Sequence, residues 1–567
     1  MPVHRDTMSV NLHKIIVARG RLGYESGKRF DNYRVSCMML ILICGTLFLC
    51  TMLTTAQQSS TNLNFPNNKI TAISKTLPTY ASWNIDSSCN RGFHHINFTN
   101  VNLQAAAKGL SPSKLRFGGS GNDFLIYQFD ANSNSCKDIP PAPATGNCSY
   151  FTDGCLNATH WNNLYQLAEQ AESDFIFGVS FDLVQACKIG SSYEWNPDNA
   201  KELLRHIKTN KQKIYGFELG NEINNHETTC NLTAIQQASA LSTFATILSN
   251  NTYFNNNNNM PKLIGPDTGY KNAEEWLKTY LPLAANSGLN AVTHHVYPGL
   301  NRETFNTPQG LDSSNDEIAW YVSVIKEYAP HSEIWAGEDG PKGGGNDGTC
   351  GGGDASICGL FASAMWFADD LGNRASKGFT QYQRQDFFGA AYGLTGSTVG
   401  LAHSALGVND PLALRPGYWI HFLWKRLVGT NVLNITSNNP MIRSYAFEGL
   451  PPSKYAHSDC KQAAYTLVLI NLQRVQPVSV NLPVVDTSTS VSFYTAWIVS
   501  PPNNITSGLP DPFSQDILLN EQKLPQTVDV TNGKGAEFLQ DIPIKTTKQT
   551  GTTIVLPPSS IAFVCVV

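Results

Sequence analysis

Two glutamates stand at the ends of short apolar runs, in settings that differ from those of the other acids. Glu222 ends the run FELGNE directly after Asn221, and Glu338 lies in IWAGED ahead of a glycine-rich stretch. Cleavage of a glycosidic bond needs such a pair, because one carboxyl group protonates the departing oxygen while the other attacks the anomeric carbon. An amide such as Asn221 is suited to hold the 2-hydroxyl of the sugar. The pair therefore indicates glycoside hydrolysis.

The elements that would position these acids are eight short apolar runs between residues 80 and 390. Polar or glycine-rich loops follow the runs, and helical stretches such as WNNLYQLAEQA and DEIAWYVSVIKEY separate several of them. The runs are ASWNID (81–86), KLRFGG (114–119), FIFGVSF (175–181), IYGFELGNE (214–222), KLIGPD (262–267), AVTHHVYP (291–298), EIWAGED (333–339) and FTQYQRQDFFG (379–389). Eight units predict an α/β fold with a (β/α)8 TIM barrel over residues 80–428, whereas a doubly wound sheet would need fewer units.

In a barrel, catalytic groups lie at the C-terminal ends of the strands. Glu222 and Glu338 end the fourth and seventh runs, so both would face one site. A single glutamate after a strand is usually a solvated loop acid, and it is the paired placement that favours a catalytic role. Asp86, Asp182 and Asp267 also end strand-like runs, but aspartate at such a position often caps the next helix.

His294, His295 and Tyr297 end the sixth run and raise the question of a metal site. No third ligand stands at a recognisable spacing, and no Cys-x-x-Cys pair occurs beyond residue 56. We therefore expect no metal and no cofactor. One histidine or Tyr297 is expected to line the sugar site and hydrogen-bond the nucleophile, and the other histidine to be structural.

The character of the sequence changes after Val428. The segments AYTLVLINL (464–472), VSVNLPVV (478–485), VSFYTAWIV (491–499) and TTIVLPPSSIAFVCVV (552–567) are rich in β-forming residues and separated by Pro, Asn, Gly and Ser. They predict a β-sandwich formed mainly by the C-terminal region, residues 429–567. Residues 57–79, of which 62–78 are extended in character, are expected to contribute to it.

The N-terminal residues differ from the rest of the chain. Residues 1–36 form a basic segment with seven Lys or Arg and three acids, and residues 37–54 are 18 positions without a charge. Such a length is near the lower limit for a membrane span, and the basic flank would hold the N-terminus in the cytoplasm. Residues 37–56 are either a signal-anchor helix, with residues 37–54 in the membrane, or a signal peptide cleaved near Ala56. Both alternatives predict the secretory pathway: extracellular, lysosomal or vacuolar, or membrane-anchored with a lumenal catalytic domain.

Cysteines, sequons and charge agree with this compartment. Ten of the 13 cysteines lie beyond residue 56, an even number as disulfides require. Glycosylation sequons mark Asn97, Asn147, Asn157, Asn231, Asn250, Asn434 and Asn504. The same part of the chain holds 33 basic and 41 acidic residues, a net charge of −8, without a long basic run. We therefore expect no nucleic-acid partner.

Several ordered motifs resemble the heparanase and β-glucuronidase family of retaining glycoside hydrolases. They are LRFGGSGNDFLIY, GFELGNE, AVTHHVYP, IWAGED, MWFADDLG, QYQRQDFFGAAYGL and PLALRPGYWIHFLWKRLVG. The resemblance runs from about residue 80 to the C-terminus, and it implies a barrel with a sandwich built from both chain ends. It implies that Glu222 is the general acid/base and Glu338 the nucleophile, and that Cys460 and Cys565 form a disulfide. It places substrate contacts at Asp86, Ser120, Asn221, His295, Tyr297, the backbone of 343–345 and Tyr392.

The departures from animal heparanase concern the substrate. Heparanase has a long excised segment flanked by basic clusters, whereas a short cysteine-containing stretch without such clusters lies between residues 127 and 161 here. Residues 270–272 read Tyr-Lys-Asn in place of Gln-x-Arg, and residues 342–345 read Lys-Gly-Gly-Gly in place of Tyr-Gly-Gly-Gly. These differences favour the plant-type, single-chain members.

The expected substrate is therefore a β-glucuronosyl linkage in a glycan, a proteoglycan or a small glucuronide. Lys342 and the backbone of Gly344 and Gly345 would hold the uronate carboxylate. Three alternatives stay open at this point: an endo-acting heparanase on heparan sulfate, another hydrolase of the same clan such as a glucanase or arabinofuranosidase, and a non-catalytic cell-surface carbohydrate-binding protein on the same fold.

Overall fold

The computed structural model describes most of the chain beyond residue 59. The described residues are 60–87, 96–129, 154–250, 252–254, 260–342, 356–389, 391–398, 406–483, 493–539, 541–542, 546 and 548–567. One compact unit spans Ser59–Val567. The basic segment 1–36 and the apolar segment 37–56 lie outside the described residues, so the choice between anchor and cleaved signal stays a prediction. Within the described ranges no helix is long and apolar enough to cross a membrane.

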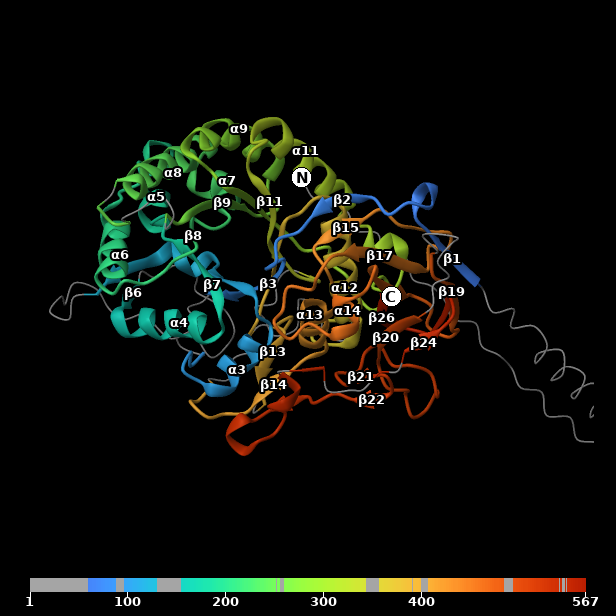
Figure 1. Cartoon of the computed structure of the whole chain (residues 1–567). Helices are drawn as coiled ribbons and strands as arrows, with labels where there is room; N and C mark the ends of the chain where they lie inside the picture. The colour runs from blue at the N-terminus through green and yellow to red at the C-terminus, as the bar shows by residue number, and fades with distance from the viewer. Residues whose placement is uncertain are drawn as a thin grey trace, which may run out of the picture. The chain divides into compact units, whose positions relative to one another are not determined.

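A closed barrel of eight parallel strands lies at the centre of this unit (Figure 1). The strands are β3 (Ala81–Asp86), β4 (Ser113–Gly118), β7 (Ser173–Val179), β8 (Gly216–Leu219), β9 (Lys262–Thr268), β10 (Ala291–Val296), β11 (Glu333–Asp339) and β12 (Gln381–Arg384). Around the barrel they follow the order β10-β11-β12-β3-β4-β7-β8-β9. Each predicted run supplies one strand, which confirms the barrel. Both faces of these strands are covered, which explains the nearly continuous apolar character of the runs.

Helices carry the crossovers and form a ring outside the barrel (Figure 1). They are α3 (Val101–Gly109), α4 (Ala158–Gln170), α5 (Leu183–Ile189), α6 (Asp198–Thr209), α8 (Ala234–Ser249), α9 (Ala273–Ala284), α11 (Asn315–Tyr328) and α12 (Phe361–Ser376). Three short elements follow strands of the barrel: η3 (Ser120–Phe124) after β4, and η5 (Ile223–His226) and α7 (Glu227–Cys230) after β8. Smaller sheets pair β5 (Leu125–Gln128) with β6 (Gly154–Asn157), and β14 (Leu412–Leu414) with β13 (Thr395–Ser397) and β23 (Thr527–Val528).

Two further sheets pack face to face as a sandwich. The larger has the order β2-β15-β17-β18-β26-β20-β21-β22, with β24 paired to β20, and the smaller has the order β16-β1-β19-β25. Their strands are β1 (Ser60–Asn64), β2 (Ala72–Lys75), β15 (Asn431–Leu433), β16 (Thr436–Ser437), β17 (Ile442–Glu448), β18 (Tyr465–Asn471), β19 (Val478–Asn481), β20 (Phe493–Ser500), β21 (Leu518–Leu519), β22 (Gln522–Lys523), β24 (Gln549–Thr550), β25 (Thr553–Leu556) and β26 (Ser560–Val566). One apolar core joins the sheets through Leu63 and Val480 of the smaller and Leu467 and Val564 of the larger. Strands β1 and β2 thus complete sheets made from the C-terminal region. The boundary at Val428 stays a prediction, because barrel and sandwich belong to one compact unit.

The helix α13 (Pro416–Leu427) lies between the barrel and the larger sheet. It packs against both β3 and β26, and all of its residues are buried. The guanidinium of Arg426 donates to the carbonyls of Gly109 (2.9 Å) and Leu539 (3.1 Å). Lys425 has no such support: within the described residues its Nζ has no hydrogen-bond partner. Burial holds the pKa of Lys425 well below its ordinary value.

Disulfide bonds link neighbouring elements of the fold. Cys460 on α14 (Ser458–Lys461) is bonded to Cys565 on β26, the pair expected from the family resemblance. Cys187 on α5 is bonded to Cys230 on α7. Cys155 and Cys358 are disulfide-bonded as well.

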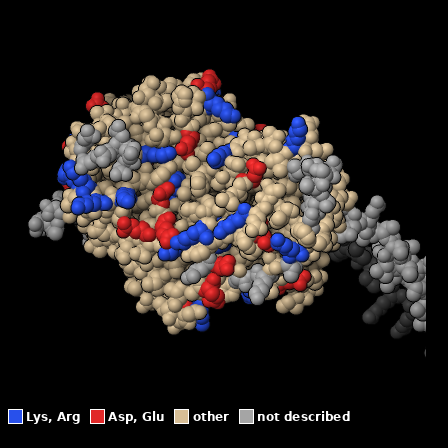
Figure 2. All heavy atoms as spheres, in the orientation of Figure 1, with Lys and Arg blue, Asp and Glu red and all other residues tan. Residues whose placement is uncertain are grey.

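The surface of the protein bears on its glycosylation and its charge. Asn231, Asn250 and Asn504 are exposed, Asn97, Asn157 and Asn434 are half-buried, and Asn147 lies outside the described residues. Glycosylation of these sequons stays a prediction. Figure 2 shows basic and acidic side chains interspersed over the face in view, without a large area of one sign.

Candidate active site

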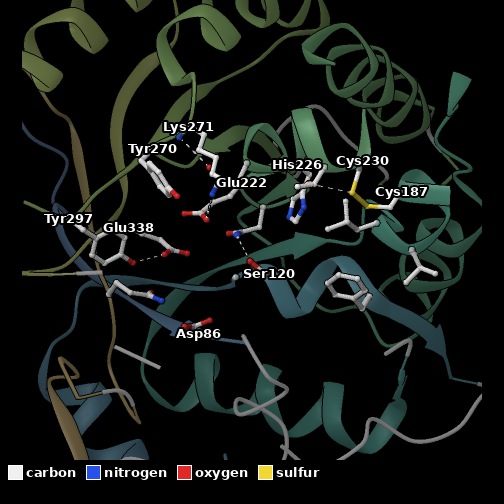
Figure 3. A pocket seen from close by; sticks show the side chains of 18 of the residues that line it. Asp86, Ser120, Cys187, Glu222, His226, Cys230, Tyr270, Lys271, Tyr297 and Glu338 are labelled. Carbon is white, nitrogen blue, oxygen red and sulfur yellow. Dashed lines mark hydrogen bonds between the residues drawn. A yellow bond between two sulfur atoms is a disulfide. The ribbon is translucent and has the colours of Figure 1, made fainter. Parts of the chain in front are cut away.

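A cavity of about 790 Å³ is lined by residues at the C-terminal ends of the barrel strands. Glu222 and Glu338 both line it, on neighbouring parts of its wall (Figure 3). One carboxylate oxygen of each lies with a ring nitrogen of His295 in a group whose members are all within 4.8 Å of one another. The fold therefore brings together the two acids that the sequence singles out.

The backbone at Glu222 departs from ordinary strand or helix geometry. Glu222 follows β8 with φ 51° and ψ 37°, in the left-handed region. A residue other than glycine adopts this conformation at a cost of about 1–2 kcal/mol. The preceding Gly220 also has a positive φ of 78°, and the backbone N–H of Glu222 donates to the carbonyl of Asp267 at 2.8 Å. This turn places the Glu222 side chain in the cavity wall.

Two strong donors hold the carboxylate of Glu338. Arg116 Nη1 donates to Oε1 at 2.6 Å, and the hydroxyl of Tyr297 donates to Oε2 at 2.8 Å. Burial, and then the nearby Glu338 carboxylate, hold the pKa of Tyr297 well above its ordinary value, so the hydroxyl keeps its proton. Charge-assisted bonds of this kind stabilise an ionised carboxylate, the state that a nucleophile needs.

Arg116 on β4 is the centre of a buried network. Its Nε donates to Glu218 (2.6 Å), and its Nη2 donates to Asp267 (2.9 Å) and to the side-chain carbonyl of Asn221 (3.0 Å). A Cβ at Gly118 would lie 2.6 Å from the guanidinium carbon, so only glycine leaves room for this side chain. Burial raises the pKa of Glu218 well above its ordinary value, whereas Arg116, His295 and Glu218 together outweigh the burial of Asp267 and lower its pKa. Asp267 therefore stays charged opposite Arg116.

His295 connects the two candidate catalytic carboxylates. Its Nδ1 lies 2.9 Å from Glu222 Oε1 and 3.6 Å from Glu338 Oε2, and its Nε2 lies 3.4 Å from Asp267 Oδ1. Burial alone would lower the pKa of His295, but these three carboxylates raise it to about 10. The other oxygen of Glu222 accepts a hydrogen bond from Asn225 Nδ2 at 2.8 Å. The Glu222 side chain is 25% exposed and that of Glu338 is 7% exposed, so Glu222 is the more accessible of the two to a group entering the cavity.

Most of the predicted substrate contacts meet at this cavity. Asp86, Ser120, Asn221, Tyr297 and Tyr392 line it, together with both glutamates. The amide of Asn221 is oriented by Arg116, and its Nδ2 lies 3.4 Å from Ser120 Oγ. A nitrogen held in this way is placed to donate to a sugar hydroxyl.

The described residues that line the cavity include none of the predicted uronate contacts. Lys342 is described and half-buried, but the described residues that line the cavity do not include it. Gly344 and Gly345 lie outside the described residues, so their contacts stay predictions. Tyr270 and Lys271 line the cavity instead, and Tyr270 is 75% exposed.

Sequence reasoning missed the buried support of the site. Arg116 lies with Lys114 inside the otherwise apolar run KLRFGG, and a buried arginine requires acidic partners, which is a signal that the sequence offers. Asp267 was expected to cap a helix, but it is 1% exposed and contacts Arg116 and His295. The capping expectation is correct for Asp182, whose side chain accepts from the backbone N–H of Gln185 at the start of α5.

Among the residues that the structure describes, two groups of side chains have the spacing of metal ligands. One is Glu222, His295 and Glu338, in which His295 carries a proton and contacts both carboxylates. The other is Cys187, His226 and Cys230, in which the two sulfurs are bonded to each other and are no thiolate ligands. Neither group offers the set of free donors that a zinc site needs.

Comparison with known proteins places this geometry in a family. The family model described as glycosyl hydrolase family 79, N-terminal domain, matches residues 77–372. The chain is 26% identical to heparanase-like protein 3 of Arabidopsis thaliana over 470 residues, covering 79% of this chain and 80% of that protein. It is 26% identical to heparanase of Bos taurus over 439 residues (70% and 75%), and 22% identical to baicalin-beta-D-glucuronidase of Scutellaria baicalensis over 473 residues (79% and 82%). The structure of the GH51 arabinofuranosidase from Xanthomonas axonopodis pv. citri superposes with a TM-score of 0.58 at 12% identity, covering 90% of this chain and all of that one, and so shares the fold.

Proposed function

Because this chain is a glycosidase that belongs to glycosyl hydrolase family 79, we propose that it removes β-linked glucuronic acid by a retaining double displacement. The observation that carries the proposal is the setting of Glu338, held by Arg116 and Tyr297 within reach of Glu222. In retaining enzymes the two carboxyl groups are about 5–5.5 Å apart, whereas inverting enzymes leave about 6.5–9.5 Å for a water molecule. An approach of oxygens within 4.8 Å supports the retaining class.

In the first step, a Glu338 oxygen attacks the anomeric carbon while Glu222, in the protonated form that the second step regenerates, gives its proton to the glycosidic oxygen. The C–O bond to the leaving group breaks, and an ester bond joins the sugar to Glu338. In the second step, Glu222 takes a proton from a water molecule, which attacks the same carbon and frees Glu338. Arg116 and Tyr297 hold Glu338 in place during both steps, and Asn221 is placed to bind the 2-hydroxyl.

The proposed specificity of the donor subsite is for glucuronic acid. A uronate needs donors for its carboxylate, which Lys342 and the glycine-rich backbone around Gly344 and Gly345 would supply. Lys271 is the only Lys or Arg among the described residues that line the cavity, and it offers a further cation. The relative from Scutellaria baicalensis is by its name a β-D-glucuronidase, which agrees with this assignment.

Action on short or terminal glucuronides is favoured over cleavage within long heparan sulfate chains. A polysulfated chain binds through clusters of cations. The part of the protein beyond residue 56 has a formal charge of −8, and the face drawn in Figure 2 carries mixed charges. Endo-acting cleavage of heparan sulfate is therefore the second candidate, supported by the likeness to heparanase.

We further propose that the enzyme acts in the secretory pathway. The apolar segment 37–54 would direct it there, whether as an anchor or as a cleaved signal. The disulfides Cys187–Cys230 and Cys460–Cys565 agree with an oxidising compartment.

The test is hydrolysis of a matched pair, an aryl β-D-glucuronide and the aryl β-D-glucoside with the same leaving group. We expect the glucuronide to have the higher kcat/KM by at least about 100-fold, the discrimination that a charged or hydrogen-bonding subsite provides. A preference for the glucoside would refute uronate specificity. Efficient release of internal fragments from long heparan sulfate would refute terminal action.

A further inference from the structure

One end of the active-site cavity is not used by the proposed chemistry. In Figure 3 the Cys187–Cys230 disulfide and His226 lie on the opposite side of Glu222 from Glu338 and Tyr297. Glu338 attacks the sugar, and Glu222 protonates the oxygen that leaves on the other face of the anomeric carbon. A leaving group must therefore extend past Glu222 toward the disulfide.

The wall at this end is mainly apolar, although His226 and Thr229 also line it. Leu183, Val184 and Cys187 line the cavity from α5, where residues three and four positions apart lie on one face of the helix. Phe124 lines it from η3, which packs against α5. The disulfide continues the wall from α5 to α7 and fixes the two helices to each other.

Few charges face the same space. Burial lowers the pKa of His226 below its ordinary value, so its ring is neutral at pH 7. Lys271 is the one Lys or Arg on the described part of the cavity wall. A sulfated or carboxylated saccharide would find only this cation, which is also offered to the uronate carboxylate, whereas a flat ring system would bury its faces against Leu183, Val184, Phe124 and the disulfide.

We propose that this end of the cavity is an aglycone site for an apolar, ring-bearing leaving group. The inference rests on the proposed glucuronidase function and adds the class of aglycone to it: a hydrophobic alcohol or phenol joined to the sugar. The cavity volume of about 790 Å³ falls in the range of small-molecule sites and accommodates a sugar with an attached ring system.

The experiment measures binding to the Glu338→Gln variant, in which the sugar is not turned over. Four ligands separate sugar from aglycone: the 2-naphthyl and methyl β-D-glucuronides and the corresponding two β-D-glucosides. We expect the naphthyl compound to bind at least about 10-fold more tightly than the methyl compound of the same sugar, as an apolar pocket provides. A ratio below about twofold for both sugars would overturn the aglycone site. Equal affinity of glucuronides and glucosides would instead refute uronate specificity and leave the aglycone site standing.

A variant pair on one helix locates the effect. Val184→Asn, added to Glu338→Gln, places a polar group on the wall and is expected to reduce the naphthyl-to-methyl ratio by about fivefold or more. Ile189→Asn changes an apolar residue of α5 that is 52% exposed and outside the cavity lining, and should leave the ratio unchanged. Equal naphthyl-to-methyl affinity ratios in the two variants would show that the naphthyl ring does not bind against this wall. The four-ligand comparison decides the proposal even if Val184→Asn does not fold.

Discussion

The substitution His295→Gln tests the electrostatics of the site. In the folded protein, the carboxylates of Glu338, Asp267 and Glu222 outweigh burial and raise the pKa of His295 from 6.5 to about 10. A raised pKa contributes stability that is fully present below about pH 6.5 and is lost as the pH rises toward 10. At 1.36 kcal/mol for each pH unit, the upper bound is about 5 kcal/mol. Removing one member of a buried ion pair costs about 3–5 kcal/mol, a similar value.

The assay is the melting temperature of wild type and variant across pH. For a unit of about 500 residues, 1 kcal/mol corresponds to roughly 1 °C. We expect His295→Gln to melt about 3–5 °C below wild type at pH 6 and less than about 2 °C below it at pH 9.5. The control is His421→Gln, because burial holds the pKa of His421 well below 6.5 and its difference from wild type should change in the opposite direction with pH. A loss for His295→Gln that is constant or grows with pH would refute the reasoning.

Three further predictions concern catalysis and stability. Glu338→Gln should reduce kcat more than about 1,000-fold. Glu222→Gln should slow alkyl glucuronides far more than aryl glucuronides with good leaving groups, because the latter need little protonation. Equal losses of Glu222→Gln on both substrates in steady-state assays would contradict the roles of the two acids. Lys425→Met should raise the melting temperature by about 1–4 °C, because it removes a buried amine without a described hydrogen-bond partner; a lower melting temperature would show that the amine is stabilising. Replacing Cys460 and Cys565 together by alanine should lower the melting temperature by about 2–4 °C, since the disulfide closes a loop across a sequence separation of 105; an unchanged value would show that the bond contributes nothing.

The barrel was predictable because each strand is a buried apolar run, and eight such runs recur with loops and helices between them. The same order placed Glu222 and Glu338 at the tips of the fourth and seventh strands, so the position of the pair followed from counting. Strands β1 and β2 were expected to be extended, and the structure pairs them with β19 and β15 of the C-terminal region. Such pairings follow from tertiary packing, since the short segments carry no information on their partners.

The support of the site was less predictable, because it depends on which side chains face one another across the barrel. Asp182 and Asp267 both end strand-like runs, yet one caps α5 and the other contacts Arg116 and His295. Sequence spacing does not distinguish them. The Cys187–Cys230 bond was equally open, since pairing among ten cysteines is set by the fold and not by their order.

In the proposed double displacement, Glu338 becomes covalently bonded to the sugar. A β-D-glucuronyl fluoride with fluorine at carbon 2 tests it directly, because the fluorine slows both steps while the good leaving group still allows the first. We predict that intact mass spectrometry shows one added fluoroglucuronyl group, and that peptide mapping places it on Glu338. An adduct on a different acid, or no adduct from an enzyme that releases the inverted sugar, would contradict a covalent intermediate on Glu338.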